Sequence, residues 1–424
     1  MKSLAIIVTH PIQYYVPVYQ QLAKVCKLKV FYTWGVQGAA DKYDPDFQKT
    51  ITWDLPLTEG YPFEFIENKA KDPGSHHFKG IVNPGLINMI NDTRPDAILV
   101  YGWAYQSHLA VMRYFKGKVP IWFRGDSTLL DRTGTIRKVM RKVLLTWVYK
   151  HVDIAFFVGK ANREYYQAYG LKEKHLLFAP HAIDNERFAS DRSVEATKLR
   201  QGLGVSAHDT LILFAGKLES KKDPLLLLQA FIAMDQQSVT NGQQPTKNQQ
   251  RSTTDEKSTL TNEKRPTTDD QQKTTNLHLL FVGNGQLEET LKTQASQHQK
   301  DNIHFLDFQN QSQMPVVYQA CNLFCLPSRG PGETWGLAVN EAMAAGKAIL
   351  VSNRVGCSTD LINRGRNGEI FNSGDQIDLR NKLHQLLRNP EDLNLMGSES
   401  KKIIQNYTFK HQVDTIAKTL NEGH

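Results

Sequence analysis

Short runs of apolar residues recur along the chain, and the stretches between them have the spacing of amphipathic helices. A first series of five runs occupies the N-terminal part of the sequence: Leu4–Val8, Leu28–Tyr32, Ala97–Tyr101, Ile121–Phe123 and Ile154–Val158. A second series of five follows after residue 205: Leu211–Ala215, Leu277–Val282, Ile303–Phe305, Leu323–Leu326 and Ala348–Val351. Strands that alternate with helices form parallel sheets. The two series therefore predict two α/β domains, joined near residues 185–208.

Residues 236–276 interrupt the second series with a different composition. They are almost all Gln, Asn, Thr, Ser or charged, and Val239 and Leu260 are the only aliphatic side chains among them. Such a stretch cannot bury enough apolar surface to offset the entropy that is lost on ordering. We therefore expect a disordered loop, inserted between a helix and the following strand. An inert insertion is the simpler interpretation, and a regulatory or docking segment is the alternative.

The overall charge and the cysteines narrow the class of protein only slightly. The 51 Lys and Arg residues against 43 Asp and Glu give a formal net charge of +8, which favours an anionic ligand or surface without identifying it. The four cysteines have neither zinc-site nor Cys-x-x-Cys spacing, and we expect buried thiols: Cys26, Cys321, Cys325 and Cys357. The first apolar run is too short for a signal peptide, and no stretch approaches the roughly eighteen residues of a membrane span. These features predict a cytoplasmic protein, or one peripheral to the inner face of the membrane.

The segment 327–346 carries the most informative motif, PSRGPGETWGLAVNEAMAAG. It follows an apolar run and leads into a short predicted helix, where glycines let the backbone approach a ligand and free amides suit a phosphate or sugar oxygen. Glu333 precedes this helix and Glu341 lies inside it, so both carboxylates can face one crevice at the carboxyl end of the sheet. Taken alone, two acids at this spacing could equally cap and solvate a helix.

Two further motifs follow neighbouring strands of the second series. After Leu211–Ala215 comes GKLESKKDP, which contains Lys217 and Lys222, with Lys221 as an adjacent alternative. The strand Leu277–Val282 ends in FVGNG, which contains Gly283, and Phe308 follows the next strand. A lysine pair after a strand is often solvated surface, and a lone Gly-x-Gly is usually only a tight turn. The order of these motifs gives them weight.

In this order, the motifs resemble the retaining glycosyltransferases of the GT-B fold, family 4 (glycosyl transferases group 1), whose Glu-x7-Glu signature matches Glu333 and Glu341. The resemblance covers about residues 175–375. It implies two Rossmann-like, doubly wound domains that face a central cleft. The acceptor-binding domain would span residues 1–185, and the nucleotide-sugar-binding domain residues 190–400. The remaining segment, 401–424, would carry a helix that returns to the N-terminal domain.

The resemblance also implies roles for individual residues. Lys217 and Lys222 would bracket the diphosphate of the donor and stabilise its growing charge as the sugar leaves. Because the family more often has Arg first, Lys217 would keep the charge but give up bidentate geometry. Glu333 would contact the transferred sugar and Glu341 a ribose hydroxyl. The other implied donor-binding residues are Gly283, Phe308, Gly336 and Leu337. The family precedent requires no metal and no cofactor besides the nucleotide-diphosphate sugar as co-substrate.

The N-terminal half matches the family mainly in layout. The loop after its first strand reads THPIQYY, at residues 9–15, where many relatives carry a glycine-rich loop. We expect His10, Asp126 and His108 to face the crevice, because loops after the strands form the acceptor site in this fold. His10 and Asp126 are candidate catalytic contacts near the reacting centre. A lone His, however, is more often structural.

The segment Thr135–His151 predicts an amphipathic basic helix. Its apolar positions have helical spacing, and Arg137, Lys138, Arg141 and Lys142 lie elsewhere around the helix. Such a helix either covers its own sheet with a solvated basic face or attaches to an anionic membrane. The second interpretation suits an enzyme with a lipid-linked acceptor.

The sequence thus predicts a hexosyltransferase-type glycosyltransferase that moves a sugar from a nucleotide-diphosphate sugar to a glycan or lipid-linked acceptor, with retention of configuration. Bacterial cell-surface polysaccharide or glycoconjugate synthesis is the expected setting, and no nucleic-acid partner is expected. The alternatives are a non-catalytic glycan-binding or scaffold protein of the same fold, and another GT-B enzyme such as an epimerase or phosphorylase. A nicotinamide dehydrogenase is disfavoured, because no Gly-x-Gly-x-x-Gly follows the first strand.

Overall fold

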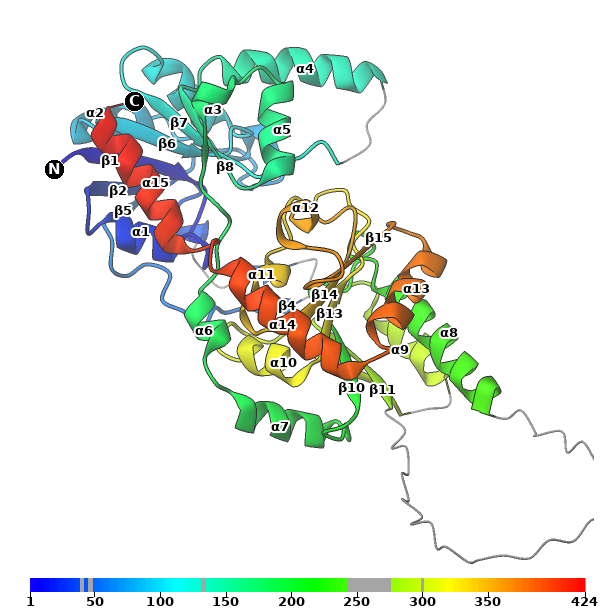
Figure 1. Ribbon diagram of the computed structural model, residues 1–424. Coiled ribbons are helices and arrows are strands. Elements are labelled where there is room, and N and C mark those ends of the chain that lie inside the picture. The colour runs from blue at the N-terminus through cyan, green and yellow to red at the C-terminus, as the bar shows by residue number, and fades with distance from the viewer. Residues whose placement is uncertain (39–41, 45–48, 131–134, 243–275, 299–300, 424) are drawn as a thin grey trace, which may run out of the picture.

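The computed structural model contains two parallel sheets, each flanked by helices, which make up the two halves of the molecule (Figure 1). It describes residues 1–38, 42–44, 49–130, 135–242, 276–298 and 301–423. The predicted fold class, two Rossmann-like domains, is confirmed.

The first sheet has seven strands in the order β5-β2-β1-β6-β7-β8-β9. Their bounds are β1 Ser3–Val8, β2 Lys27–Tyr32, β5 Phe63–Phe65, β6 Ala97–Tyr101, β7 Ile121–Arg124, β8 Ile154–Phe157 and β9 Leu176–Phe178. A small antiparallel pair, β3 (Lys42–Asp44) and β4 (Lys49–Ile51), stands apart from this sheet. We refer to this half as the N-domain.

The second sheet has six strands in the order β12-β11-β10-β13-β14-β15. Their bounds are β10 Thr210–Ala215, β11 Leu277–Val282, β12 Ile303–Leu306, β13 Leu323–Leu326, β14 Ala348–Ser352 and β15 Gly368–Phe371. This half is the C-domain. The ten predicted strands are all present in the two sheets, each to within one residue at either end. The sequence did not predict the short strands β5, β9 and β15, two of which contain a glutamate that weakens the apolar run.

Helices connect the strands and cover both faces of each sheet, so the central strands are buried throughout, as is typical of parallel sheets (Figure 1). In the N-domain the helices are α1 Val16–Leu22, α2 Leu86–Thr93, α3 Gln106–Phe115, α4 Thr135–Tyr149 and α5 Lys160–Ala168. The next five helices along the chain are α6 Asn185–Ala189, α7 Ser193–Gly202, α8 Pro224–Gly242, α9 Glu288–Ser296 and α10 Met314–Ala320. The last five are α11 Leu337–Ala344, α12 Ser358–Leu361, α13 Gln376–Leu386, α14 Pro390–Ile404 and α15 Phe409–Glu422.

The chain passes between the domains twice. It leaves the N-domain after β9, and α15 then packs back against α1, where Val413, Ile416 and Leu420 join the apolar cluster beneath β1. Two polar side chains fix α15 to the first crossing: Gln412 Nε2 donates to the Pro180 carbonyl at 2.9 Å, and Thr415 Oγ1 to that of Phe178 at 3.2 Å. The last helix of the chain is therefore part of the N-domain.

The predicted start of the insertion, residue 236, is wrong. Residues 236–242 are helical, because α8 continues to Gly242. The apolar first turns of α8 pack in the core, and a helix that has already nucleated propagates through polar residues at little cost. The rest of the predicted insertion, residues 243–275, lies outside the described residues.

Helix α4 turns most of its apolar row outward. Ile136, Val139, Met140 and Val143 are 61–77% exposed, and the helix is anchored to the N-domain through residues such as Leu145 and Val148. The helix was predicted, with two interpretations of its apolar row. The sheet-covering interpretation holds for its C-terminal turns, where Val148 packs in the N-domain core, and not for the exposed apolar residues between 136 and 143. Among the described helices, none is long and apolar enough to cross a membrane.

Candidate functional site

A cavity of about 370 Å³ lies at the carboxyl ends of the C-domain strands. The loops after successive strands and helix α11 supply its predicted donor-binding residues, and six of these line it: Lys217, Lys222, Gly283, Phe308, Leu337 and Glu341. Residues from the N-domain close the opposite side. The volume falls within the usual range for small-molecule sites.

Glycines bring the turn after β10 and the turn after β11 into direct contact. Gly283 has φ +127°, and a Cβ on it would lie 2.2 Å from the carbonyl oxygen of Gly216. Gly285 has φ +154°, and its Cβ would lie 2.6 Å from the carbonyl oxygen of Leu218. Only glycine tolerates this approach. The Gly-x-Gly motif therefore holds the turn that carries Lys217 at the cavity wall.

Lys222 and Glu333 form a nearly buried ion pair beside the cavity. Lys222 Nζ lies 2.5 Å from Glu333 Oε2, which also accepts a hydrogen bond from Ser328 Oγ at 2.8 Å. The Glu333 side chain is 7% exposed and does not itself line the cavity. The two predicted residues are thus brought together, and the carboxylate fixes the position of the ammonium group.

Gly336 shapes the start of α11 without lining the cavity. It has φ +97°, and a Cβ there would lie 2.8 Å from Val355 Cγ1. Leu337 follows as the first residue of α11 and does line the cavity. A side chain at position 336 would push the start of this helix, with its amides, away from the loop that follows β14.

Glu341 is buried in the cavity wall between two tyrosines. Its Oε2 accepts a hydrogen bond from Tyr318 Oη and its Oε1 one from Tyr14 Oη, both at 2.8 Å. Burial raises the pKa of Glu341, and the two hydrogen bonds act in the opposite direction. Burial, together with the nearby Glu341, raises the pKa of Tyr14 well above its usual value, so the phenol stays a donor.

Tyr14 belongs to the N-domain, and sequence reasoning assigned its loop to the acceptor side. The structure instead places it on the C-domain carboxylate, 327 residues away in the chain. Trp53 was missed entirely: it lines the cavity, and its ring centroid lies 6.2 Å from that of Phe308. The polar loop after the first strand was a usable signal for Tyr14, whereas nothing in the pattern around Trp53 marks it.

The candidate acceptor residues lie outside this cavity. His10 accepts or donates a hydrogen bond with Thr9 Oγ1 at 2.8 Å and packs edge-on against Trp34. His108 does not face the crevice as expected: it is fully buried, and its ring nitrogens bond Thr33 Oγ1 and the Gly102 carbonyl. Both ring nitrogens of His108 have hydrogen-bond partners inside the N-domain, so the residue is structural.

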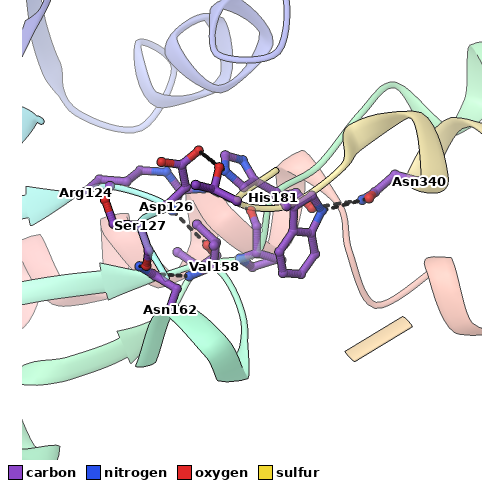
Figure 2. A network of polar contacts seen from close by, with 12 residues as sticks. Arg124, Asp126, Ser127, Val158, Asn162, His181 and Asn340 are labelled. Atoms are coloured by element: carbon purple, nitrogen blue, oxygen red, sulfur yellow. Dashed lines mark hydrogen bonds and ion pairs between the residues drawn. The ribbon is translucent and has the colours of Figure 1, made fainter. Parts of the chain in front are cut away.

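Asp126 forms part of a polar network that joins the two domains (Figure 2). Thr334 Oγ1, in the C-domain loop beside Glu333, donates to Asp126 Oδ2 at 2.7 Å, and His181 Nε2 lies 3.9 Å from the same oxygen. Burial, the largest influence, acts to raise the pKa of Asp126, but the hydrogen bonds from His181 and Thr334 outweigh it and the net shift is downward. Burial lowers the pKa of His181, which favours a neutral ring.

The same network continues on either side of Asp126 (Figure 2). The buried Arg124 donates to the carbonyls of Ala179 and Pro180 at the first crossing between domains. On the other side, Asn340 Nδ2 donates to the His181 carbonyl and its Oδ1 accepts from Trp335 Nε1. That His10 and Asp126 contact the acceptor remains a prediction. In the structure, Asp126 also links the two domains.

Within the described ranges, one group of side chains has the spacing of metal ligands. It consists of Asp72, His76 and His77 in a surface loop of the N-domain. None of the three lines the cavity. The cavity itself is lined by lysines, which suit an anion.

Comparisons with known proteins point to one family. Residues 268–403 match the family described as glycosyl transferases group 1. The chain is 25% identical over 142 residues to the O-antigen chain mannosyltransferase C of Escherichia coli, covering 33% of this chain and 38% of the relative. It is 25% identical over 230 residues to D-inositol 3-phosphate glycosyltransferase of Gordonia bronchialis, covering 53% and 43% respectively. The chain thus spans less than half the length of each of these relatives.

Solved structures resemble the whole chain. HepE of Anabaena in complex with UDP has a TM-score of 0.68 at 17% identity and is matched over 100% of both chains. Sucrose-phosphate synthase of Thermosynechococcus elongatus has a TM-score of 0.68 at 13% identity, over 100% of this chain and 99% of that one. At these identities the likeness shows a shared fold, with two facing α/β domains.

Proposed function

We propose that the protein is a hexosyltransferase-type glycosyltransferase, on the premise that residues 268–403 match the glycosyl transferases group 1 family. It transfers a sugar from a nucleotide-diphosphate sugar to a glycan or lipid-linked acceptor, with retention of configuration. Its setting is the synthesis of bacterial cell-surface polysaccharide or glycoconjugate, in the cytoplasm or on the inner face of the membrane. The names of the partly matching relatives, which include an O-antigen mannosyltransferase, support this setting.

One observation carries the proposal: two lysines and a buried carboxylate line the same cavity. Lys217 and Lys222 suit a diphosphate, whereas Glu341 accepts hydrogen bonds as a ribose diol would require. A cavity lined by both kinds of group suits a nucleoside diphosphate better than a simple anion. The UDP bound to the structural relative HepE makes UDP the first nucleotide to test.

The ion pair between Lys222 and Glu333 supports a role in the transfer step. As the bond between sugar and diphosphate breaks, negative charge grows on the diphosphate, and a fixed ammonium group stabilises it without first having to reorganise. Glu333 holds Lys222 in place through this ion pair. We propose that these groups and the amides at the start of α11 suffice without a metal or further cofactor.

A thermal-shift screen with UDP, GDP, ADP and their sugar conjugates tests the proposal. A transferase should gain stability with one base, because a ligand that binds only the folded state raises its melting temperature. A non-catalytic scaffold should respond to none of them. Mass spectrometry of the products then separates the enzymes: a transferase yields a glycosylated acceptor, an epimerase an isomeric nucleotide sugar, and a phosphorylase a sugar phosphate that depends on orthophosphate.

The outward face of α4 supports the lipid-linked acceptor. Its exposed apolar side chains, such as Ile136 and Val143, stand beside Arg137, Lys138 and Lys142, which are exposed too. Between Thr135 and Tyr149 the helix contains no acidic residue. An apolar stripe flanked by cations is the combination that inserts into the interface of an anionic bilayer. We propose that α4 binds such a bilayer reversibly.

Co-sedimentation with vesicles of phosphatidylglycerol and phosphatidylcholine tests the role of α4. Each Lys or Arg near an anionic surface contributes about 1 kcal/mol before screening, so replacing Arg137, Lys138 and Lys142 with Gln should release the protein. The matched control replaces three exposed lysines elsewhere, Lys24, Lys172 and Lys198. If the wild-type protein fails to sediment with these vesicles at low salt, the proposed membrane contact is wrong.

A further inference from the structure

The donor cavity has a wall that the C-domain does not provide. Tyr14 follows β1, and Trp53 lies in the segment after β4; both line the cavity opposite the C-domain residues. The cavity is therefore complete only when the two domains stand as they do here. Two aromatic rings, Trp53 and Phe308, line this end of the cavity and are arranged edge to face.

Tyr14 orients the carboxylate that faces the ribose position. Its hydroxyl donates to Glu341 Oε1 at 2.8 Å and is contacted by Gln311 Nε2 at 3.5 Å. A carboxylate has about four lone-pair positions. Tyr14 and Tyr318 occupy one position on each oxygen of Glu341, so acceptor sites remain for a ribose diol.

A short strap of the N-domain is tied to the C-domain beside the aromatic pair. Asn310 Nδ2 donates to the Thr52 carbonyl at 2.6 Å, and the Ser312 amide donates to Asp54 Oδ2 at 2.9 Å. These bonds lie on either side of Trp53 in sequence and hold its ring over the cavity. The strap is thus positioned by the loop that follows β12, the loop that also carries Phe308.

From these contacts we propose that the N-domain takes part in recognising the donor nucleotide: Trp53 packs against the base, and Tyr14 fixes Glu341 for the ribose. The inference rests on the proposed function and adds the N-domain residues that contact the base and position the carboxylate for the ribose. Nucleotide binding then bridges the domains and holds them closed. An aromatic ring can pack against any base, so polar groups around Trp53 would have to select one base.

The test measures nucleoside-diphosphate affinity of the full chain by calorimetry, with UDP and then the best nucleotide from the thermal-shift screen. Trp53→Ala should weaken binding on the order of tenfold, the usual loss for one base–aromatic contact, and Trp53→Phe should restore most of it. Trp147→Ala on α4, which is 40% exposed and far from the cavity, is the matched control. Inorganic pyrophosphate should compete equally well in all of these variants, because the lysines are untouched.

Tyr14→Phe should lower affinity several-fold while leaving the melting temperature of the free protein nearly unchanged, with Tyr105→Phe as its control. A rise in affinity would overturn the proposal, because Tyr14 would then obstruct the nucleotide instead of preparing its site. Wild-type affinity in both Trp53→Ala and Tyr14→Phe would also overturn it, and would leave the donor site in the C-domain standing. If the wild-type protein binds no nucleoside diphosphate, the proposed function itself is wrong.

Discussion

The two walls of the proposed donor cavity are held in place by different interactions. In the C-domain wall, backbone meets backbone: a Cβ on Gly283 would lie 2.2 Å from the Gly216 carbonyl oxygen, and the strands beneath are fully buried. In the N-domain wall, a few polar contacts such as Tyr14 to Glu341 span two separate cores. The first wall cannot yield without breaking its domain, whereas the second can separate as a unit. A nucleotide would therefore meet a fixed phosphate side and a movable base side.

Glu333→Ala should produce the largest effect on the fixed wall. Loss of the carboxylate frees Lys222, and removing one preorganised charge contact of the transition state typically costs about 10²–10³-fold in kcat. Nucleoside-diphosphate affinity should change much less. Steady-state kinetics and calorimetry give the two values, and Glu369→Ala, which removes the partner of Lys382 away from the cavity, is the control. Equal losses in affinity and turnover would contradict the assignment.

Gly283→Ala should break the fixed wall structurally. A Cβ at φ +127° combines backbone strain with a clash against Gly216, and we expect a loss of about 3 kcal/mol in unfolding free energy. Chemical denaturation measures it. Gly202→Ala in α7, where a Cβ meets nothing within 4 Å, should be neutral or slightly stabilising. Similar stability of the two variants would show that the turns after β10 and β11 are loosely packed.

Glu341→Ala removes the carboxylate at which the two walls are in contact, through Tyr14. A hydrogen bond to a charged group is worth about 1.5–3 kcal/mol, so nucleoside-diphosphate affinity should fall roughly ten- to a hundredfold. Because the ribose does not change during transfer, kcat at saturating donor should fall less than it does in Glu333→Ala. A larger loss of kcat than of affinity would show that Glu341 acts in the transfer step, the role assigned here to Glu333.

His108 offers a smaller test, confined to the N-domain. Burial lowers its pKa to about 4, so folding favours the neutral ring. As pH falls below about 6.5 the unfolded chain takes up the proton first, and stability that is complete above this pH is lost towards pH 4. Between pH 7.5 and 5.5 this amounts to about 1 kcal/mol. His108→Gln should remove that part of the pH dependence of unfolding; an unchanged slope would refute the buried neutral ring.

The two walls also differ in what a single sequence reveals. Lys217, Gly283 and Phe308 could be predicted, because each directly follows an apolar strand and the ends of parallel strands meet at one edge. The contact of Tyr14 with Glu341 depends on how two domains are placed, and no local pattern records that placement. Likewise, the spacing of α4 predicted its helix, but the outward direction of Ile136 depends on which residues the N-domain core accepts.

Deleting residues 243–275, with a short Gly-Ser bridge in their place, should have the smallest effect. The segment is nearly free of apolar residues, and nothing in its composition suggests that folding needs it. Melting temperature and transfer rate should stay close to those of the full chain. A deletion variant that accumulates only as insoluble protein would show that the segment contributes to the fold.

The position at which α8 ends has a practical consequence. α8 stops at Gly242 and β11 starts at Leu277, both at the amino ends of the C-domain strands, whereas the donor cavity lies at their carboxyl ends. A biotin acceptor sequence placed between these positions would attach the protein to a surface with its cleft facing away. Immobilised in this way, the C-domain would be held still while the N-domain stays free, and single-molecule measurements could follow the opening of the cleft directly.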